Sequence, residues 1–143
     1  MVMKKMINII SITVMVLFSG CKSENPTVES IVGGWVAENG AVIELFKDGT
    51  FSTENLTGDK IFPYENEYKG KAFTEKGTWK IGDDKGLWVV YLYFKKSVNL
   101  PKGYSTQILI SGSKGIMENQ PPWYLFLWEG EEGGSRYKFS KKN

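Results

Sequence analysis

The stretch WVAENGAVIELFKDGTFSTE, residues 35–54, decides the fold. It contains Asn39-Gly40 and Asp48-Gly49, two dipeptides that favour tight hairpin turns because Asn, Asp and Gly tolerate positive φ angles. These turns separate three short segments, many of whose residues are β-branched or aromatic: 35–38, 41–47 and 50–54. The stretch therefore predicts three antiparallel strands that follow one another as a meander, with two-residue turns between them.

The rest of the chain continues the alternation of strand and turn. Five further segments have strand character, most of them with the period of two that half-buried strands show: 77–81, 87–94, 104–111, 123–129 and 136–140. Residues 87–94 are apolar on both faces, which indicates a strand covered on both sides or one whose outer face meets a partner. About eight short antiparallel strands predict an all-β barrel or sandwich.

Four other segments interrupt or precede the eight predicted strands. Residues 27–32 are expected to form one helical turn with Thr27 as its N-cap. Residues 55–76 are long for a loop without structure, so we expect a short strand or helix within them. Residues 82–86 are interpreted as a turn, and residues 112–122 as an irregular stretch that Pro121-Pro122 stiffens.

The first 20 residues have the composition of a secretory signal. Lys4 and Lys5 precede an apolar run, residues 6–18, that is shorter than the roughly 20 residues needed to span a bilayer. Small residues follow, and then Cys21, the only cysteine of the chain. An ordinary signal peptide or an uncleaved anchor would also fit this composition.

The sequence Phe18-Ser19-Gly20-Cys21 resembles the lipobox of bacterial lipoproteins, although that family usually has Leu where this chain has Phe18. The resemblance implies cleavage before Cys21, a diacylglycerol on its thiol and an acyl chain on its new amine. It divides the chain into a signal peptide (1–20), a lipidated tether (21–27) and a domain (28–143). The membrane partner would be reached through this lipid. Lys22, where enterobacterial inner-membrane lipoproteins tend to have Asp, favours the outer membrane of the bacterial cell envelope.

Composition excludes several functions. The chain has no histidine, and its one cysteine is assigned to the anchor, which rules out Ser-His-Asp and Cys-His catalysis and zinc sites built from these residues. Loss of the first 20 of 143 residues would leave 16 basic and 16 acidic side chains, so nothing indicates nucleic acid as a partner. We predict neither catalytic residues nor a metal or other cofactor. Two acidic clusters are interpreted as solvated turns: Asp83-Asp84, and Glu129 with Glu131-Glu132.

Three motifs occur in order along the domain: Ile31-x-Gly33-x-Trp35, Phe46-Lys-Asp-Gly-Thr-Phe51 and Gly77-Thr-Trp-Lys-Ile81. Together they resemble the small lipocalin-like domains of bacterial lipoproteins. The resemblance implies an up-and-down antiparallel β-barrel of about eight strands. In lipocalins the Trp of Gly-x-Trp plugs one end of the barrel and an Arg of the last strand packs across it, and Trp35 and Arg136 match these positions. The domain is short for a lipocalin and lacks the long helix that usually follows the barrel.

Aromatic residues supply the candidate binding residues. The set expected to contact a ligand or partner is Trp88, Tyr91, Tyr93, Trp123 and Trp128. The leading hypothesis is a non-enzymatic, lipid-anchored protein that binds a small apolar ligand or an envelope protein. The alternative is an inhibitor or immunity-type lipoprotein whose segments 55–76 and 112–122 plug another protein's site. A Tyr- or Trp-lined cavity inside the barrel would favour a ligand, and a filled barrel with its aromatics outside would favour a protein.

Overall fold

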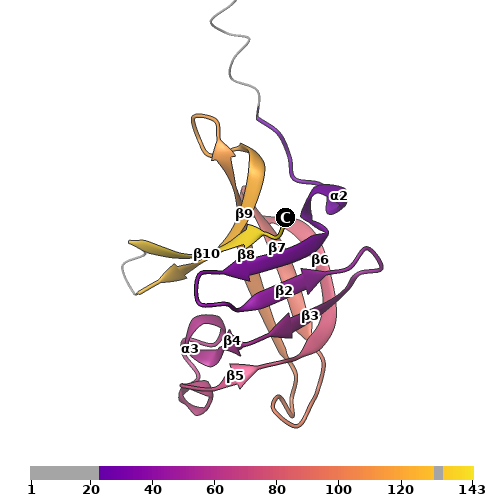
Figure 1. Cartoon of the computed structure of the whole chain (residues 1–143), viewed down its shortest axis with the longest axis vertical. Helices are drawn as coiled ribbons and strands as arrows, with labels where there is room; N and C mark the ends of the chain where they lie inside the picture. The colour runs from indigo at the N-terminus through magenta and orange to yellow at the C-terminus, as the bar shows by residue number, and fades with distance from the viewer. Residues whose placement is uncertain (1–22, 131–133) are drawn as a thin grey trace, which may run out of the picture.

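The chain folds into a closed antiparallel β-barrel of eight strands (Figure 1). A computed structural model describes residues 23–130 and 134–143, so the predicted signal peptide and Cys21 lie outside the described residues. The barrel strands are β1 (Gly33–Ala37), β2 (Val42–Leu45), β3 (Thr50–Glu54), β6 (Lys76–Asp84), β7 (Leu87–Phe94), β8 (Tyr104–Lys114), β9 (Gln120–Glu129) and β10 (Ser135–Lys141). Each pairs with the barrel strands before and after it in the chain, and pairing of β1 with β10 closes the ring. The all-β, up-and-down architecture expected from the sequence is confirmed.

The first two hairpins form where the turn dipeptides predicted them, but by a different geometry. Each hairpin loop has three residues. The amide of Ala37 donates to the carbonyl of Ala41 in the first hairpin, and the amide of Phe46 donates to the carbonyl of Thr50 in the second. Gly40 and Gly49 take the left-handed conformation, with φ of 85° and 86°. The expected two-residue turns are therefore wrong here, and glycine serves as the left-handed third residue of a longer loop.

The segment 55–76 contains the short elements that its length suggested. They are β4 (Leu56–Thr57), α3 (Gly58–Ile61), a 3₁₀ turn (Asn66–Tyr68) and β5 (Ala72–Phe73), and β4 pairs with β5 beside the barrel. The helical turn near the start is confirmed as α2 (Val28–Ile31), where Thr27 and Ser30 form a reciprocal capping box. Among the described residues, no helix is long and apolar enough to cross a membrane.

Two segments expected to be irregular are largely strand. Strand β6 continues to Asp84, and the turn is only Lys85-Gly86, both with positive φ, as a two-residue turn requires. Strands β8 and β9 likewise extend their hairpin into 112–122, with a register shift between Gly112 and Lys114. Pro121 and Pro122 lie near the start of β9 beside this irregularity, where a missing amide is tolerated.

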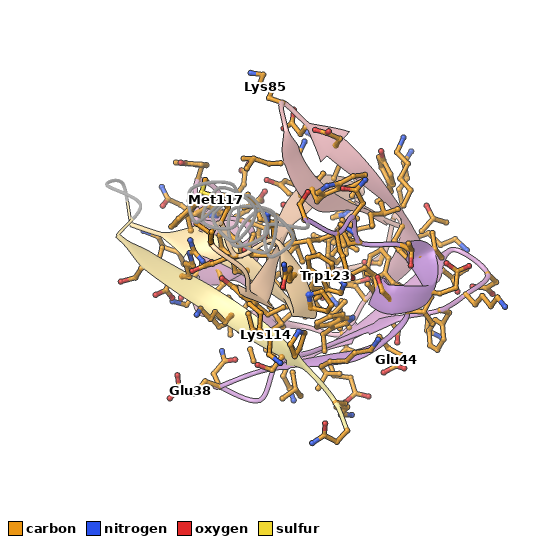
Figure 2. All side chains as sticks on the ribbon, turned by 90° about the horizontal axis from the view of Figure 1, so that it is seen from above. Glu38, Glu44, Lys85, Lys114, Met117 and Trp123 are labelled. Atoms are coloured by element: carbon orange, nitrogen blue, oxygen red, sulfur yellow. The ribbon has the colours of Figure 1, made fainter. Side chains whose placement is uncertain are left out.

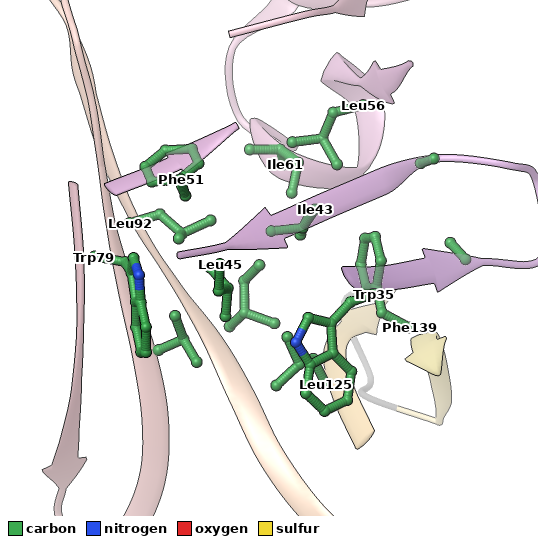
Figure 3. Close-up of a cluster of buried hydrophobic side chains, with 14 of the residues drawn as sticks. Trp35, Ile43, Leu45, Phe51, Leu56, Ile61, Trp79, Leu92, Leu125 and Phe139 are labelled. Carbon is green, nitrogen blue, oxygen red and sulfur yellow. The ribbon is translucent and has the colours of Figure 1, made fainter. Parts of the chain in front are cut away.

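Large side chains fill the barrel interior. Trp35, Ile43, Phe51, Leu92 and Leu125 are among those with at most 1% of their surface exposed, and Figure 3 shows them converging from facing walls. The α3 segment contributes further buried residues, with Ile61 and Phe62 packed at one end. Interiors packed in this way have few voids larger than a water molecule.

Trp35 closes the other end of the barrel, beneath α2. Its side chain is fully buried and its indole Nε1 donates to the carbonyl of Ile31 at 2.9 Å. The cation over its ring is Lys141, whose Nζ lies 5.5 Å from the ring centroid and donates to the carbonyl of Ser30. The pairing of Trp35 with Arg136 is therefore wrong. Trp35 is opposite Lys141 in the strand register, whereas Arg136 lies farther down β10, on its outer face.

Candidate binding surface on the outer wall

The five aromatic residues predicted to contact a ligand or partner divide between the two faces of the sheet. Trp88 and Trp123 are half-buried and pack against the interior core. Tyr91, Tyr93 and Trp128 point outward, because successive side chains of a strand alternate between the faces. The prediction grouped these five by sequence, and the structure leaves only the outward three accessible as a group.

The outward residues form part of a surface that runs across β6, β7, β8, β9 and β10, which we call the outer aromatic surface. It comprises Lys80, Tyr91, Tyr93, Trp128 and Arg136, with the buried Phe126 ring lying under the Arg136 guanidinium. In the register, Lys80 is opposite Tyr91 and Trp128 is opposite Arg136, while Gln107 of β8 follows Tyr91. Trp128 is 49% exposed and Tyr93 is 39% exposed. Partly exposed aromatic side chains that gather on one face mark a surface able to meet a partner.

Arg136 stacks on this surface. Its guanidinium carbon lies 4.6 Å from the ring centroid of Phe126 and 5.0 Å from that of Trp128. The same group donates to the Glu118 carboxylate at 2.6 Å and to the hydroxyl of Tyr124. Packing of a guanidinium between aromatic rings and a carboxylate fixes its orientation, since each contact restrains a different direction.

Glu118 links this surface to the β8–β9 hairpin. Hydrogen bonds from the Tyr124 hydroxyl, and then from Arg136, lower the pKa of the Glu118 carboxyl from 4.5 to about 2. Burial raises the pKa of the Tyr124 hydroxyl, so it remains a hydrogen-bond donor at neutral pH. The carboxylate therefore stays ionised across the physiological range.

Two lysines lie over aromatic rings on this side of the barrel. Lys80 places its Nζ 5.5 Å from the Tyr91 ring and 5.8 Å from that of Tyr93, and Lys138 lies 4.7 Å from the Tyr124 ring. An aromatic surface bordered by such cations favours an acidic or π-rich partner.

A groove of about 600 Å³ adjoins the outer aromatic surface at Tyr93. It lies where β3, β6 and β7 meet, and its lining is mostly apolar. Its residues are Phe46, Thr50, Phe51, Ser52, Lys76, Gly77, Thr78, Tyr93 and Lys95. Three smaller depressions of about 100–470 Å³ involve β10, the β8–β9 hairpin or the α3 end of the barrel.

Sequence reasoning missed Lys80, Glu118, Tyr124 and the stacked position of Arg136. Lys80 could have been found from the strand parity of 77–81, which puts it on the face opposite Trp79. Glu118 could not, because its contact with Arg136 depends on how the β8–β9 hairpin folds back. The Asp83 side chain caps its own turn by accepting from the Gly86 amide at 2.7 Å, in agreement with a structural role.

Glu129, also interpreted as part of a solvated turn, is instead half-buried and paired with Lys60 of α3. In residues 23–130 and 134–143, no three His, Cys, Asp or Glu side chains come together as they would to hold a metal ion. Comparison with protein-family models, with curated proteins and with solved structures found no match for this chain. A function is therefore inferred from the geometry of the outer wall.

Proposed function

We propose that this chain is a lipid-anchored, non-enzymatic binding protein of the bacterial cell envelope that engages another envelope protein through the outer aromatic surface. The observation that carries the proposal is the division of the aromatic residues. The interior is filled by residues such as Trp35 and Leu92, while Tyr93 and Trp128 remain accessible outside. This arrangement favours a protein partner over a ligand held within the barrel.

The chemistry of the surface supports this proposal. Trp, Tyr and Arg are the residue types that most often dominate binding energy at protein interfaces. Arg136 is already oriented by Phe126, Trp128 and Glu118, so binding would cost little of its side-chain entropy. The cations Lys80 and Lys138 favour a partner with acidic residues around an apolar centre.

A second candidate is binding of a small amphiphile in the groove beside Tyr93. The groove combines a mostly apolar lining with two lysines, Lys76 and Lys95. Its volume of about 600 Å³ is within the range of about 300–1,000 Å³ that small-molecule sites occupy. An anionic headgroup with an apolar tail would suit this combination.

The inhibitor or immunity-type alternative needs projecting segments. Residues 55–76 bury Leu56, Phe62 and Phe73 against the barrel, so most of their apolar side chains are already used. The β8–β9 hairpin retains exposed side chains at its tip, but the broader outer aromatic surface offers more aromatic area. We therefore propose the outer aromatic surface as the binding site.

In-cell photocrosslinking tests the proposal. A photoreactive phenylalanine analogue at Trp128 should give one discrete protein adduct, and an Arg136→Ala change should weaken it. The same analogue at Tyr64, which is exposed and lies in the segment between α3 and β5, serves as the matched control. Adducts that form equally at both positions, or at neither, would contradict the assignment. Palmitate labelling of the wild type, lost in Cys21→Ser, tests the anchor separately.

A further inference from the structure

We infer that the tip of the β8–β9 hairpin is a second point of attachment to the lipid bilayer, which sets the orientation of the barrel on the membrane. The inference rests on the proposed function, because it assumes that Cys21 carries lipid. The tip of the hairpin meets the apolar boundary beneath the lipid headgroups.

The tip has the composition of a membrane-contacting element. Ile116 is 82% exposed and Met117 is 79% exposed, so two neighbouring apolar side chains are largely open to solvent. Lys114 is also exposed at this end of the hairpin, where it could pair with lipid phosphate. Apolar side chains flanked by a cation are the combination that interfacial segments use.

The start of the described chain lies against this same hairpin. The amide of Glu24 donates to the carbonyl of Asn119 at 3.0 Å, two residues beyond Met117. Figure 1 shows the hairpin projecting beyond the barrel on the side where the chain enters α2, and Figure 2 views it from that end with Met117 and Lys114 labelled. Strand directions place α2, the Lys85 turn and this hairpin at one end, with the 95–103 loop at the other.

The short chain between Cys21 and the hairpin limits how far the domain can lie from the membrane. Cys21 precedes Glu24 by three residues, and three extended residues span at most about 11 Å. A lipid on Cys21 therefore places the membrane surface within roughly that distance of Glu24, which is hydrogen-bonded to Asn119 of the hairpin. Exposed apolar residues at the tip would then lie where lipid is nearest.

The hairpin is also held in position. Glu118, directly after Met117, accepts hydrogen bonds from Tyr124 at 2.7 Å and from Arg136 at 2.6 Å. The amide of Gly112 donates to the carbonyl of Glu118 at 2.6 Å. These contacts tie the base of the tip to β9 and β10, so the tip is presented at a fixed angle to the wall and little ordering entropy is lost on insertion.

The test uses full-length protein acylated in bacterial cells and reconstituted in liposomes of phosphatidylethanolamine and phosphatidylglycerol. Acylation consumes the native thiol, so a cysteine introduced at Met117 is the one that takes an environment-sensitive fluorophore. Val98, 97% exposed in the loop at the opposite end, is the matched apolar control. Nitroxide-labelled lipid should quench most of the emission from position 117 and leave that from position 98 unchanged.

A second experiment tests whether the fluorophore at position 117 inserts into the bilayer by itself. The fluorophore is placed at Lys114, with and without the double change Ile116→Ser and Met117→Ser. Quenching at Lys114 should fall in the double variant while acylation and thermal unfolding are unchanged. Acylated protein without quenching at position 117, or equal quenching at 117 and 98, would overturn this inference alone. Protein without the acyl mass on Cys21 would overturn the proposed function and this inference together.

Discussion

Replacing Leu92 by alanine tests whether the barrel interior is a packed core. Leu92 is fully buried, and in the register it lies between Trp79 of β6 and Thr106 of β8. Three carbon groups are lost from the side chain, which removes about 2.4 kcal/mol of transfer free energy at about 0.8 kcal/mol each. A cavity that the closed ring cannot collapse adds about 24 cal/mol per Å³, so we expect a total of about 3–5 kcal/mol.

Urea unfolding followed by tryptophan fluorescence measures this change. Leu92→Ala should lower the midpoint with an unchanged slope, because the surface exposed on unfolding stays nearly the same. Leu87→Ala is the matched control on the same strand, and since Leu87 is largely exposed it should cost less than about 1 kcal/mol. A loss below about 1 kcal/mol in Leu92→Ala would refute the reasoning, since it would mean that Leu92 lines open space rather than a packed core.

Further changes test the close backbone contact at Gly77, the β8–β9 hairpin and the end of the barrel that Trp35 closes. Gly77→Ala should strongly destabilise the protein in thermal unfolding, because an added Cβ would lie 2.0 Å from a carbonyl oxygen of β7; Gly134→Ala, which meets no atom within 4 Å, should be close to neutral. Glu118 stabilises the fold above its unfolded pKa of about 4.5, and this contribution should disappear as the pH falls towards about 2. Hydrogen-exchange protection at the β8–β9 hairpin, measured relative to the intrinsic exchange rate at each pH, should therefore fall over this window in the wild type, and a Glu118→Gln variant that shows the same pH dependence would contradict the assignment. Trp35→Phe should cost about 1–3 kcal/mol in urea unfolding because the buried carbonyl of Ile31 loses its donor, and an unchanged midpoint would argue against that hydrogen bond.

The central part of each barrel strand could be predicted from the sequence because the signals of a strand are local. Alternation of apolar and polar residues and glycine-containing turns depend on near neighbours, and each of the eight predicted segments lies mainly within one barrel strand. The geometry of the hairpin loops was harder to predict from the sequence. Asn39-Gly40 looks the same whether it forms a two-residue turn or the last two residues of a three-residue loop, and the hydrogen bond from Ala37 to Ala41 decides between them.

The site was harder to predict, because it depends on which face each residue occupies and on what lies across the barrel. Trp88 and Tyr91 are close in sequence and both aromatic, yet one packs inward and the other points out. The resemblance predicted that Arg136 packs on Trp35, but the position of Arg136 on β10 puts its side chain outside the barrel, against Trp128. The cation that lies over the Trp35 ring is Lys141. Parity along β10 would have separated the two cations, once the register with β1 was known.

Closure by the first and last strands has a consequence for how the protein is made. Until residues 135–141 are available for pairing, β1 lacks one of its two neighbours and presents a row of unpaired amides and carbonyls. Such edges seed aggregation in incomplete chains. Loss of only a few residues from β10 would leave the ring open, and the damage would appear as insoluble protein in the cell rather than as a weaker interaction.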